Sequence, residues 1–378
     1  MKIGIVVPYS WSFWGGVVDH AEQQMRALHA LGADARIIIG NDPPGSFTRV
    51  LHPSLGRHTD VPPEVIPVGR SVIVPANGTL PNIVLSPPSV FRIRRVLERE
   101  RFDVVHVHEP MTPAIGVATL AIWEGPLVTT NHANGNLAWM RGAAPLWGFL
   151  MNRVDRRLAV SEEARQSAAR WLPGEYEIVP NGVLVPPHAE AASREQHVVF
   201  IGRHEARKGM HVLLRAWPEI HARTGARLRL VGADPLAVRL VLTRERVDGT
   251  GIDALGSLSN EDLTEELLRA KVLVAPSLHG ESFGMVLLRG FACAVPVVAS
   301  DIPGYRNVVT PETGVLVPPG DADALASAVG DVLADEPARV RRGAAARELA
   351  GERYAWSSIA ARLLEIYESV AGRVPAAA

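Results

Sequence analysis

The residues with the clearest chemical potential surround Glu281. This carboxylate follows an apolar run at 272–276 that is typical of a buried parallel strand, and a helical pattern comes after it. The free N–H groups and the dipole of a helix start attract phosphate, a carboxylate accepts hydrogen bonds from hydroxyls, and Gly280 and Gly284 would let a ligand approach the backbone closely. The stretch 279–290 therefore indicates a pocket for a polyhydroxylated, phosphorylated ligand, such as a nucleotide sugar, and a plain strand–loop–helix crossover is an equally open alternative.

A second group of charges lies in the loop 202–209, which also follows an apolar run. Arg203, Arg207 and Lys208 belong to this loop. Cations so grouped can neutralise a diphosphate, although the same residues would also suit an exposed surface.

Two histidines fall where predicted parallel strands end. His108 follows the run at 104–107, and His132 follows the run at 127–131. The ligand crevice of an open α/β sheet lies at the carboxyl ends of its strands. The placement leaves a ligand-binding role and a structural role equally open.

The elements that must position these residues form two similar series. An apolar strand pattern at 3–8, a glycine-containing loop at 9–16 and a helical pattern at 17–31 open the chain. The same order recurs at 197–201, 202–209 and 210–217, after a linker-like stretch at 184–196. Continuous apolar strands alternating with helices predict an α/β protein, here with two Rossmann-like domains that face each other. From 321 to about 364 the pattern is helical.

Composition narrows the class of protein. The chain has 378 residues, 47% of them hydrophobic and 21% charged, with a net charge of −1. This balance suits a globular protein and gives no overall field for nucleic acid. The single cysteine, Cys293, excludes a disulfide framework and favours a reducing compartment, with a core position expected for its side chain. We expect a cytoplasmic protein without a spanning helix, because no apolar run is long enough for one.

A basic amphipathic helix is expected near 88–101. Arg92, Arg94 and Arg95 could contact an anionic membrane surface, which would make the protein peripheral on the inner face of the membrane. Trp11, Phe13 and Trp14 could join that contact, or they could pack in a cleft or stack on a sugar. The alternative for the helix is an ordinary solvated face.

Several motifs in a consistent order resemble the retaining glycosyltransferases of family 4, which have the GT-B fold. The likeness covers nearly the whole chain and is greatest to phosphatidylinositol mannosyltransferases. It rests on residues 280–285, Gly202 and Arg203 with Lys208 and Gly209, 179–183, Gly15 and Gly16, His132, 8–10, 77–79, 106–110 and the basic helix.

The resemblance implies a fold and a set of roles. It implies an N-terminal acceptor-side domain at 1–190, a nucleotide-sugar domain at 191–352, and a final helix in 353–378 that returns to the first domain. His132, Glu281, Arg203 and Lys208 would serve the reaction. The implied donor contacts are Gly16, Arg203, Lys208, Glu281, Ser282, Phe283, Gly284, Met285, Val286 and Arg289, and the implied acceptor-side residues are Tyr9, Val18, Asn82 and His108.

Three positions depart from the family pattern. The pattern usually has a second Glu where this chain has Arg289, which can donate but not accept a hydrogen bond. The inositol-lipid enzymes carry Gln at the position of Val18 and Arg at that of Asn82. These changes remove contacts expected for the nucleotide ribose and for a phosphoinositol headgroup.

The resulting hypothesis is transfer of a hexose from a nucleotide sugar to a lipid or small polar acceptor. GDP-mannose is favoured over a UDP-sugar as the donor, with no further cofactor, and we expect no metal. The alternatives are a nucleotide-sugar-binding protein without turnover, suggested by Arg289, and a sugar-nucleotide epimerase on the same scaffold. The sequence does not fix the oligomeric state.

Overall fold

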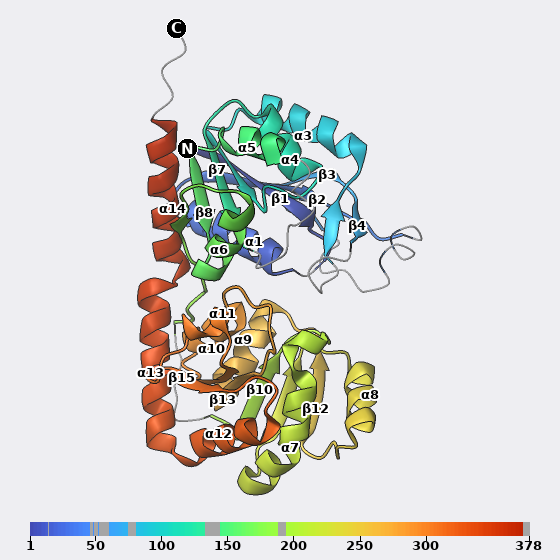
Figure 1. Cartoon of the computed structure of the whole chain (residues 1–378), viewed down its shortest axis with the longest axis vertical. Coiled ribbons are helices and arrows are strands. Elements are labelled where there is room, and N and C mark those ends of the chain that lie inside the picture. Colours follow the sequence, from blue (N-terminus) through green and yellow to red (C-terminus); the bar gives the residue numbers. More distant parts are fainter. Residues whose placement is uncertain are drawn as a thin grey trace. The chain divides into compact units, whose positions relative to one another are not determined.

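The chain forms two compact units in a computed structural model (Figure 1). The structure describes residues 1–13, 15–45, 48, 52, 60–74, 81–132, 144–187 and 194–372, without the side chains of 144–146. Trp14 and the motif at 77–79 lie outside these ranges. Unit 1 comprises Met1–Gly182 and Trp356–Ala378, and unit 2 comprises Val183–Ala355.

Unit 1 is built on a sheet whose main path is parallel. The strand order is β3-β2-β1-β6-β7-β8-β9, and the short strands β4 and β5 form an antiparallel pair of which β5 also meets β1. The strands are β1 (Lys2–Ser10), β2 (Asp34–Gly40), β3 (Val65–Gly69), β4 (Ser71–Ile73), β5 (Asn82–Val84), β6 (Val104–His108), β7 (Leu127–Asn131), β8 (Arg156–Ala159) and β9 (Glu177–Ile178). Its helices are α1 (Gly16–Ala30), α3 (Pro87–Glu100), α4 (Ile115–Ile122), α5 (Ala144–Met151), α6 (Glu162–Trp171) and α14 (Trp356–Ala371).

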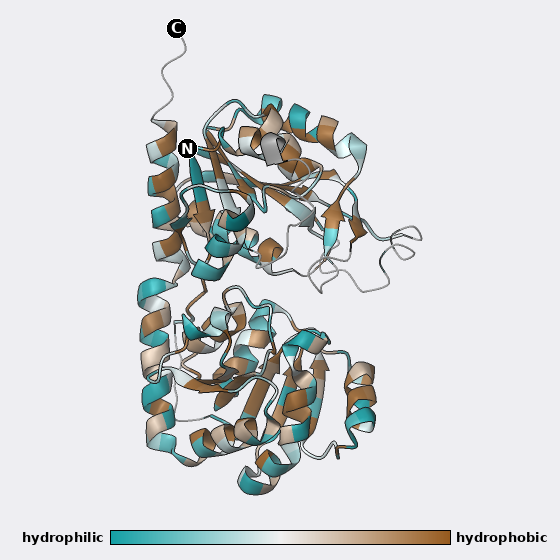
Figure 2. Ribbon diagram, viewed as in Figure 1, coloured by the Kyte–Doolittle hydropathy of each residue, from teal (hydrophilic) through white to brown (hydrophobic). Residues whose placement is uncertain are grey.

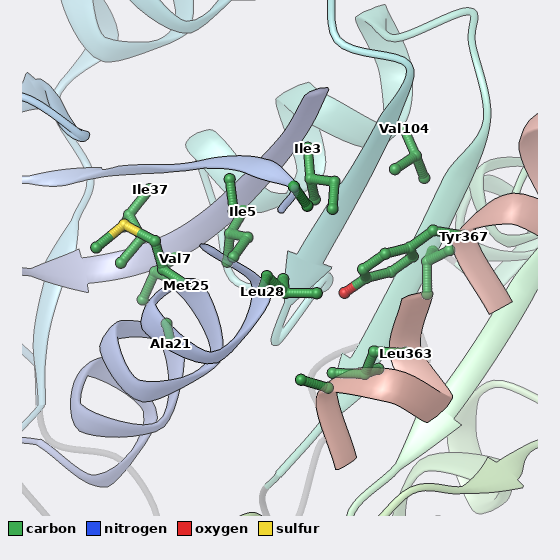
Figure 3. Packing of buried hydrophobic residues seen from close by; sticks show 14 of the residues in the cluster. Ile3, Ile5, Val7, Ala21, Met25, Leu28, Ile37, Val104, Leu363 and Tyr367 are labelled. Atoms are coloured by element: carbon green, nitrogen blue, oxygen red, sulfur yellow. The ribbon is translucent and has the colours of Figure 1, made fainter. Parts of the chain in front are cut away.

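The last helix of the chain completes the core of unit 1. In Figure 3, Leu363 and Tyr367 of α14 lie beside Leu28 of α1 and Ile3 of β1. Burial of each large apolar side chain stabilises the fold by about 1.5–3 kcal/mol. Apolar residues recur along one stripe of α14 (Figure 2), which is why this helix packs on unit 1, as the resemblance implies.

Unit 2 is a fully parallel sheet in the order β12-β11-β10-β13-β14-β15. Its strands are β10 (His197–Ile201), β11 (Arg227–Val231), β12 (Ile252–Gly256), β13 (Val272–Ala275), β14 (Val297–Ser300) and β15 (Gly314–Val317). Its helices are η2 (Ala206–Lys208), α7 (Met210–Thr224), α8 (Pro235–Glu245), α9 (Asn260–Arg269), α10 (Met285–Ala292), α11 (Pro303–Arg306), α12 (Ala322–Ala334) and α13 (Glu336–Arg353).

Both sheets reverse their strand order at one point. In unit 1 the strands after β1 are added on one side of it, and the strands from β6 onward are added on its other side. In unit 2 the same reversal occurs between β10 and β13. Ligands of open α/β sheets bind at the carboxyl ends of the strands where such a reversal occurs. We therefore expect functional residues in the loops after β10 and β13 of unit 2 and at the carboxyl ends of β1 and β6 of unit 1.

One expectation from the sequence is confirmed in more detail, and another needs correction. The stretch from 321 to about 364 is helical as expected, and it consists of three helices, because Asp335 caps a new helix by accepting a hydrogen bond from the N–H of Ala338 at 2.9 Å, and a second break precedes α14. The linker predicted at 184–196 includes Arg194, which is buried. Its guanidinium donates to the carbonyls of Leu267, Ala270 and Cys293, so the end of this stretch is part of unit 2.

Candidate functional site

The two charged loops of unit 2 are held together by a glycine. Gly209 ends the first loop with φ of +69°, and a Cβ atom at this position would lie 1.8 Å from the carbonyl oxygen of Pro276. Only glycine accepts both the left-handed backbone and this approach. The N–H of Leu278 also donates to the carbonyl of Arg207 at 2.7 Å. These contacts fix the loop after β10 against the loop after β13.

Five charged side chains alternate in sign across the two loops. Arg203 Nη2 lies 2.7 Å from Glu205 Oε1, and Glu205 Oε2 lies 2.7 Å from Arg207 Nη2. Arg207 Nη1 then meets Glu281 Oε1 at 2.8 Å, and Lys208 Nζ meets the same oxygen at 2.7 Å. The structure thus brings together Arg203, Lys208 and Glu281, which the sequence singles out, and it adds Glu205 as a partner that the sequence analysis missed.

The carboxylate of Glu281 has a supporting layer behind it. Ser277 Oγ lies 3.4 Å from Glu281 Oε1 and 3.0 Å from the hydroxyl of Tyr305. Burial, and then the charge of Glu281, raise the pKa of Tyr305, which stays a neutral hydrogen-bonding group. Gly304 leaves room for the Glu281 carbonyl, since a Cβ there would lie 2.1 Å from that oxygen. The support comes from α11, which no motif in the sequence connects to Glu281.

Helix α10 begins directly after this carboxylate. Its N-cap is Gly284, with φ of +83° and no side-chain cap, so the first turn can present backbone N–H groups to an anion. Met285, Val286 and Ser282 are partly exposed there. Phe283 is buried and packs edge-on against Tyr354, so only its backbone could face a ligand.

Arg289 lies further along α10 and reaches away from Glu281's loop toward α9. Its Nη1 donates to the side-chain oxygen of Asn260 at 3.0 Å. Asn260 is the first residue of α9, which Ser259 caps by accepting from the N–H of Asp262. The ion pairs that form the alternating set among the described residues join Arg203, Glu205, Arg207, Lys208 and Glu281, whereas the described contact of Arg289 is with Asn260.

The histidines of unit 1 gather at the carboxyl ends of β6 and β7. His108 Nδ1 and His132 Nε2 are 2.8 Å apart, and His20 of α1 packs edge-on against both rings. Burial, followed by the neighbouring histidines, lowers the pKa of His108 and His132 well below the usual value. Burial also lowers the pKa of His20 to about 4. At neutral pH these three side chains are neutral hydrogen-bonding groups.

A second network ties the end of the chain to the same region. His106 Nδ1 is 2.6 Å from the hydroxyl of Tyr367 on α14, and its Nε2 is 2.7 Å from Thr130 Oγ1. Gln24 Nε2 donates to the Tyr367 hydroxyl at 2.8 Å. Burial lowers the pKa of His106 to about 3. His106 stacks on His108, with ring centroids 4.5 Å apart, so the network supports the pair that contains His132.

Metal binding is a chemical option for three of these histidines. One nitrogen each from His20, His108 and His132 lies within 4.8 Å of the others. Two nitrogens on one tetrahedral zinc ion, at about 2.1 Å from it, would be about 3.4 Å apart. The 2.8 Å spacing of His108 and His132 instead fits a direct hydrogen bond. The expectation that the function requires no metal stays a prediction.

The acceptor-side residues of the sequence analysis divide into two groups. Tyr9 on β1 pairs with Ile83, which places it next to Asn82 on β5. Asn82 Oδ1 is buried and has no hydrogen-bond partner in the described part of the chain. Val18 instead packs in the hydrophobic core, so its side chain is not an acceptor contact. At Gly16 an added Cβ would meet nothing within 4 Å, which leaves open space beside the backbone.

Two aromatic residues of the first loop, Trp11 and Phe13, are buried and do not face lipid. Trp11 is 1% exposed, and its indole donates to the carbonyl of Asp60. Phe13 is also buried, with its ring 4.5 Å from that of His52. Their apolar surface is used inside unit 1, which corrects the membrane-contact hypothesis for these two residues. Trp14 lies outside the described residues.

The basic helix α3 keeps its arginines on the surface. Arg92, Arg94 and Arg95 are exposed, although Arg94 pairs with Glu98 at 2.8 Å. Phe91 beside them is 70% exposed. Among the helices of the described residues, none is long and apolar enough to cross a bilayer.

Comparison with known proteins places this architecture in a class. Residues 14–184 match the family described as Glycosyltransferase Family 4, and residues 195–335 match Glycosyl transferases group 1. Sucrose-phosphate synthase from Thermosynechococcus elongatus superposes with a TM-score of 0.75 at 21% identity, covering 99% of this chain and 100% of that one. Anabaena Alr3699/HepE in complex with UDP and glucose superposes with a TM-score of 0.72 at 19% identity, covering 98% and 100%.

The chain belongs to the family 4 retaining glycosyltransferases and has the GT-B fold. The phosphatidyl-myo-inositol mannosyltransferase of Mycobacterium leprae is similar to it along nearly its whole length. The two are 33% identical over 98% of this chain and 97% of the mycobacterial protein. The resemblance seen in the sequence is thereby confirmed at the level of the family.

Proposed function

We propose that this glycosyltransferase moves a mannosyl group from GDP-mannose to a lipid or small polar acceptor. The observation that carries the proposal is the set of ion pairs joining Lys208 and Arg207 to Glu281 beside the start of α10. Unit 2 brings together cations that suit a diphosphate, a carboxylate that suits sugar hydroxyls, and the start of a helix without a side-chain cap. The mannosyltransferase name of the mycobacterial relative supports mannose as the sugar.

The reaction chemistry follows from these residue types. The bond between the sugar C1 and the diphosphate oxygen breaks, and a bond from C1 to the acceptor oxygen forms on the same face. The departing phosphate oxygen takes the acceptor's proton, so no protein nucleophile is required. Arg203 and Lys208 would stabilise the charge that develops on the leaving diphosphate. The neutral His132 would hold the sugar through hydrogen bonding or ring contact, without donating a proton from an imidazolium.

The acceptor is the less constrained part of the proposal. The name of the mycobacterial relative favours an inositol lipid, and an exposed arginine helix in unit 1 suits peripheral binding to the anionic inner face of a membrane. Burial of Val18 and the presence of Asn82 favour a changed headgroup contact. A soluble inositol phosphate and a phosphatidylinositol vesicle are therefore both suitable test acceptors.

A ligand screen followed by product analysis tests the function. GDP-mannose should raise the melting temperature more than UDP- or ADP-sugars, because a ligand that binds the folded state stabilises it by mass action. Mannosylated product should then form with one of the two acceptors. Glu281→Ala and Lys208→Ala should abolish transfer, while Glu265→Ala, at an exposed pair on α9, should leave it unchanged.

The outcomes also separate the alternatives. Normal transfer by both Glu281→Ala and Lys208→Ala would show that the site is wrongly assigned. Donor binding without hydrolysis or transfer over a broad acceptor panel would favour a binding protein. Conversion of the donor with no acceptor present would identify an epimerase.

Membrane contact is tested separately on α3. Sedimentation with anionic vesicles at low salt should deplete the protein from solution. Replacing Arg92 and Arg95 with glutamine should reduce this binding, whereas the same change at Arg165 and Arg170 of α6 should not. An absence of binding at low salt would remove the membrane from the proposal.

A further inference from the structure

Glu205 occupies an unusual place among the charges of unit 2. It sits in the loop after β10 and faces two cations, with one carboxylate oxygen 2.7 Å from Arg203 and the other 2.7 Å from Arg207. Its side chain is 17% exposed, while that of Arg203 is 58% exposed. A carboxylate with two oxygens, each beside a different cation, has the charge pattern of a short bridging anion.

We propose that Glu205 is an internal substitute for the donor's diphosphate. Its carboxylate pairs with Arg203 and Arg207 and is displaced from them when a nucleoside diphosphate binds. This inference rests on the proposed function, since it takes Arg203 as a cation that binds the diphosphate. It assigns Glu205 a regulating role in affinity and product release, without contact to the reacting atoms.

The charge balance of the loops supports displacement. The alternating set contains three cations and two carboxylates, so its net charge is only +1 with Glu205 in place. A nucleoside diphosphate brings at least two negative charges to the same cations. Glu205 would then be a like charge beside the phosphates, and like charges at short range are unfavourable. Moving its side chain away releases both arginines for the ligand.

The hydrogen-bond geometry also supports displacement of the Glu205 side chain by a diphosphate. Glu205 Oε2 is buried and makes no aligned hydrogen bond within the described part of the chain, despite its short ion pair to Arg207. Arg207 Nε is likewise a buried donor with no partner among the described residues. Buried polar groups that stay unsatisfied cost free energy. Phosphate oxygens could accept from Arg207 where Glu205 does not.

The backbone allows the side chain to leave without unfolding the loop. The N–H of Glu205 donates to the carbonyl of Arg203 at 2.7 Å, and its own carbonyl accepts from the N–H of Lys208 at 2.9 Å. These bonds, and the contact of Gly209 with Pro276, do not involve the carboxylate. A rotation of the Glu205 side chain is therefore sufficient.

Calorimetric titration of the full chain with GDP, UDP and inorganic pyrophosphate tests this role. Glu205→Gln keeps the size of the side chain and removes its charge. It should tighten binding of the preferred nucleotide and of pyrophosphate by about fivefold, the scale of one partly exposed ion pair. The salt dependence of binding should also become steeper. Glu265→Gln, which removes one negative charge from the surface of the same unit, should change neither.

The result that overturns the inference is unchanged or weaker binding by a folded Glu205→Gln protein. Glu205→Ser removes the charge by another route and must behave in the same way if the glutamine variant does not fold. Product release should slow in either variant, so turnover at saturating donor should fall while nucleotide affinity rises. A wild-type protein that binds none of the three probes would instead contradict the proposed function.

Discussion

Four buried histidines should make the stability of unit 1 strongly dependent on pH. Burial lowers the pKa of His20 to about 4 and that of His106 to about 3 from an ordinary value of 6.5. The folded pKa is below the unfolded one, so the unfolded state binds more protons as pH falls below 6.5. Stability is therefore complete above pH 6.5 and is lost as pH falls toward 4. Linkage gives a loss of about 2 kcal/mol for each of these two residues between pH 8 and pH 5.

Urea unfolding at several pH values measures this effect. Hydrogen exchange of peptides from β6 and β7 would assign the change to unit 1. His106→Gln, which cannot titrate, should be less stable than the wild type at pH 8 because its contacts with Tyr367 and Thr130 change. Its further loss on moving to pH 5 should be smaller than that of the wild type by about 2 kcal/mol. Equal losses in the two proteins would refute the assignment of a buried, neutral His106.

Three further predictions concern other parts of the chain. Gly209→Ala should weaken GDP binding at least tenfold in calorimetry, because its Cβ would collide with the carbonyl of Pro276; unchanged binding would show that the two loops are not rigidly joined. The pH profile of kcat should lack an inflection near 6.5 from His132, because burial keeps its pKa well below that value; an inflection that disappears in His132→Gln would contradict this. Burial raises the pKa of the Cys293 thiol to about 11, so iodoacetamide at pH 8 should label it only after unfolding; rapid labelling of the folded protein would refute its burial.

The sequence was sufficient to locate the strands that position the site. The apolar runs at 197–201 and 272–275 appear as β10 and β13, and their adjacency follows from the two-directional order of such sheets. Glycine spacing and charge indicated which loops to examine. The resemblance to the family 4 glycosyltransferases then implied that Arg203, Lys208 and Glu281 belong to one donor site.

The remaining features depend on contacts between distant residues. Gln24 and Tyr367 are 343 residues apart in the chain, and no local pattern connects them. Tyr305 reaches Glu281 through Ser277 from a separate helix. The sequence left lipid contact and internal packing both open for Trp11, and only the folded structure shows that it is buried. No motif in the sequence distinguished Glu205, because its proposed role depends on its contacts with Arg203 and Arg207 in the folded structure.

The return of α14 to unit 1 determines the order in which the chain can fold during synthesis. Unit 2 is continuous from Val183 to Ala355, so all of its strands are available before the last helix is made. Unit 1 lacks Trp356, Leu363 and Tyr367 until α14, which follows unit 2 in the sequence, has been synthesised. Its nascent form therefore exposes the apolar surface of β1 and α1 while unit 2 is already able to fold.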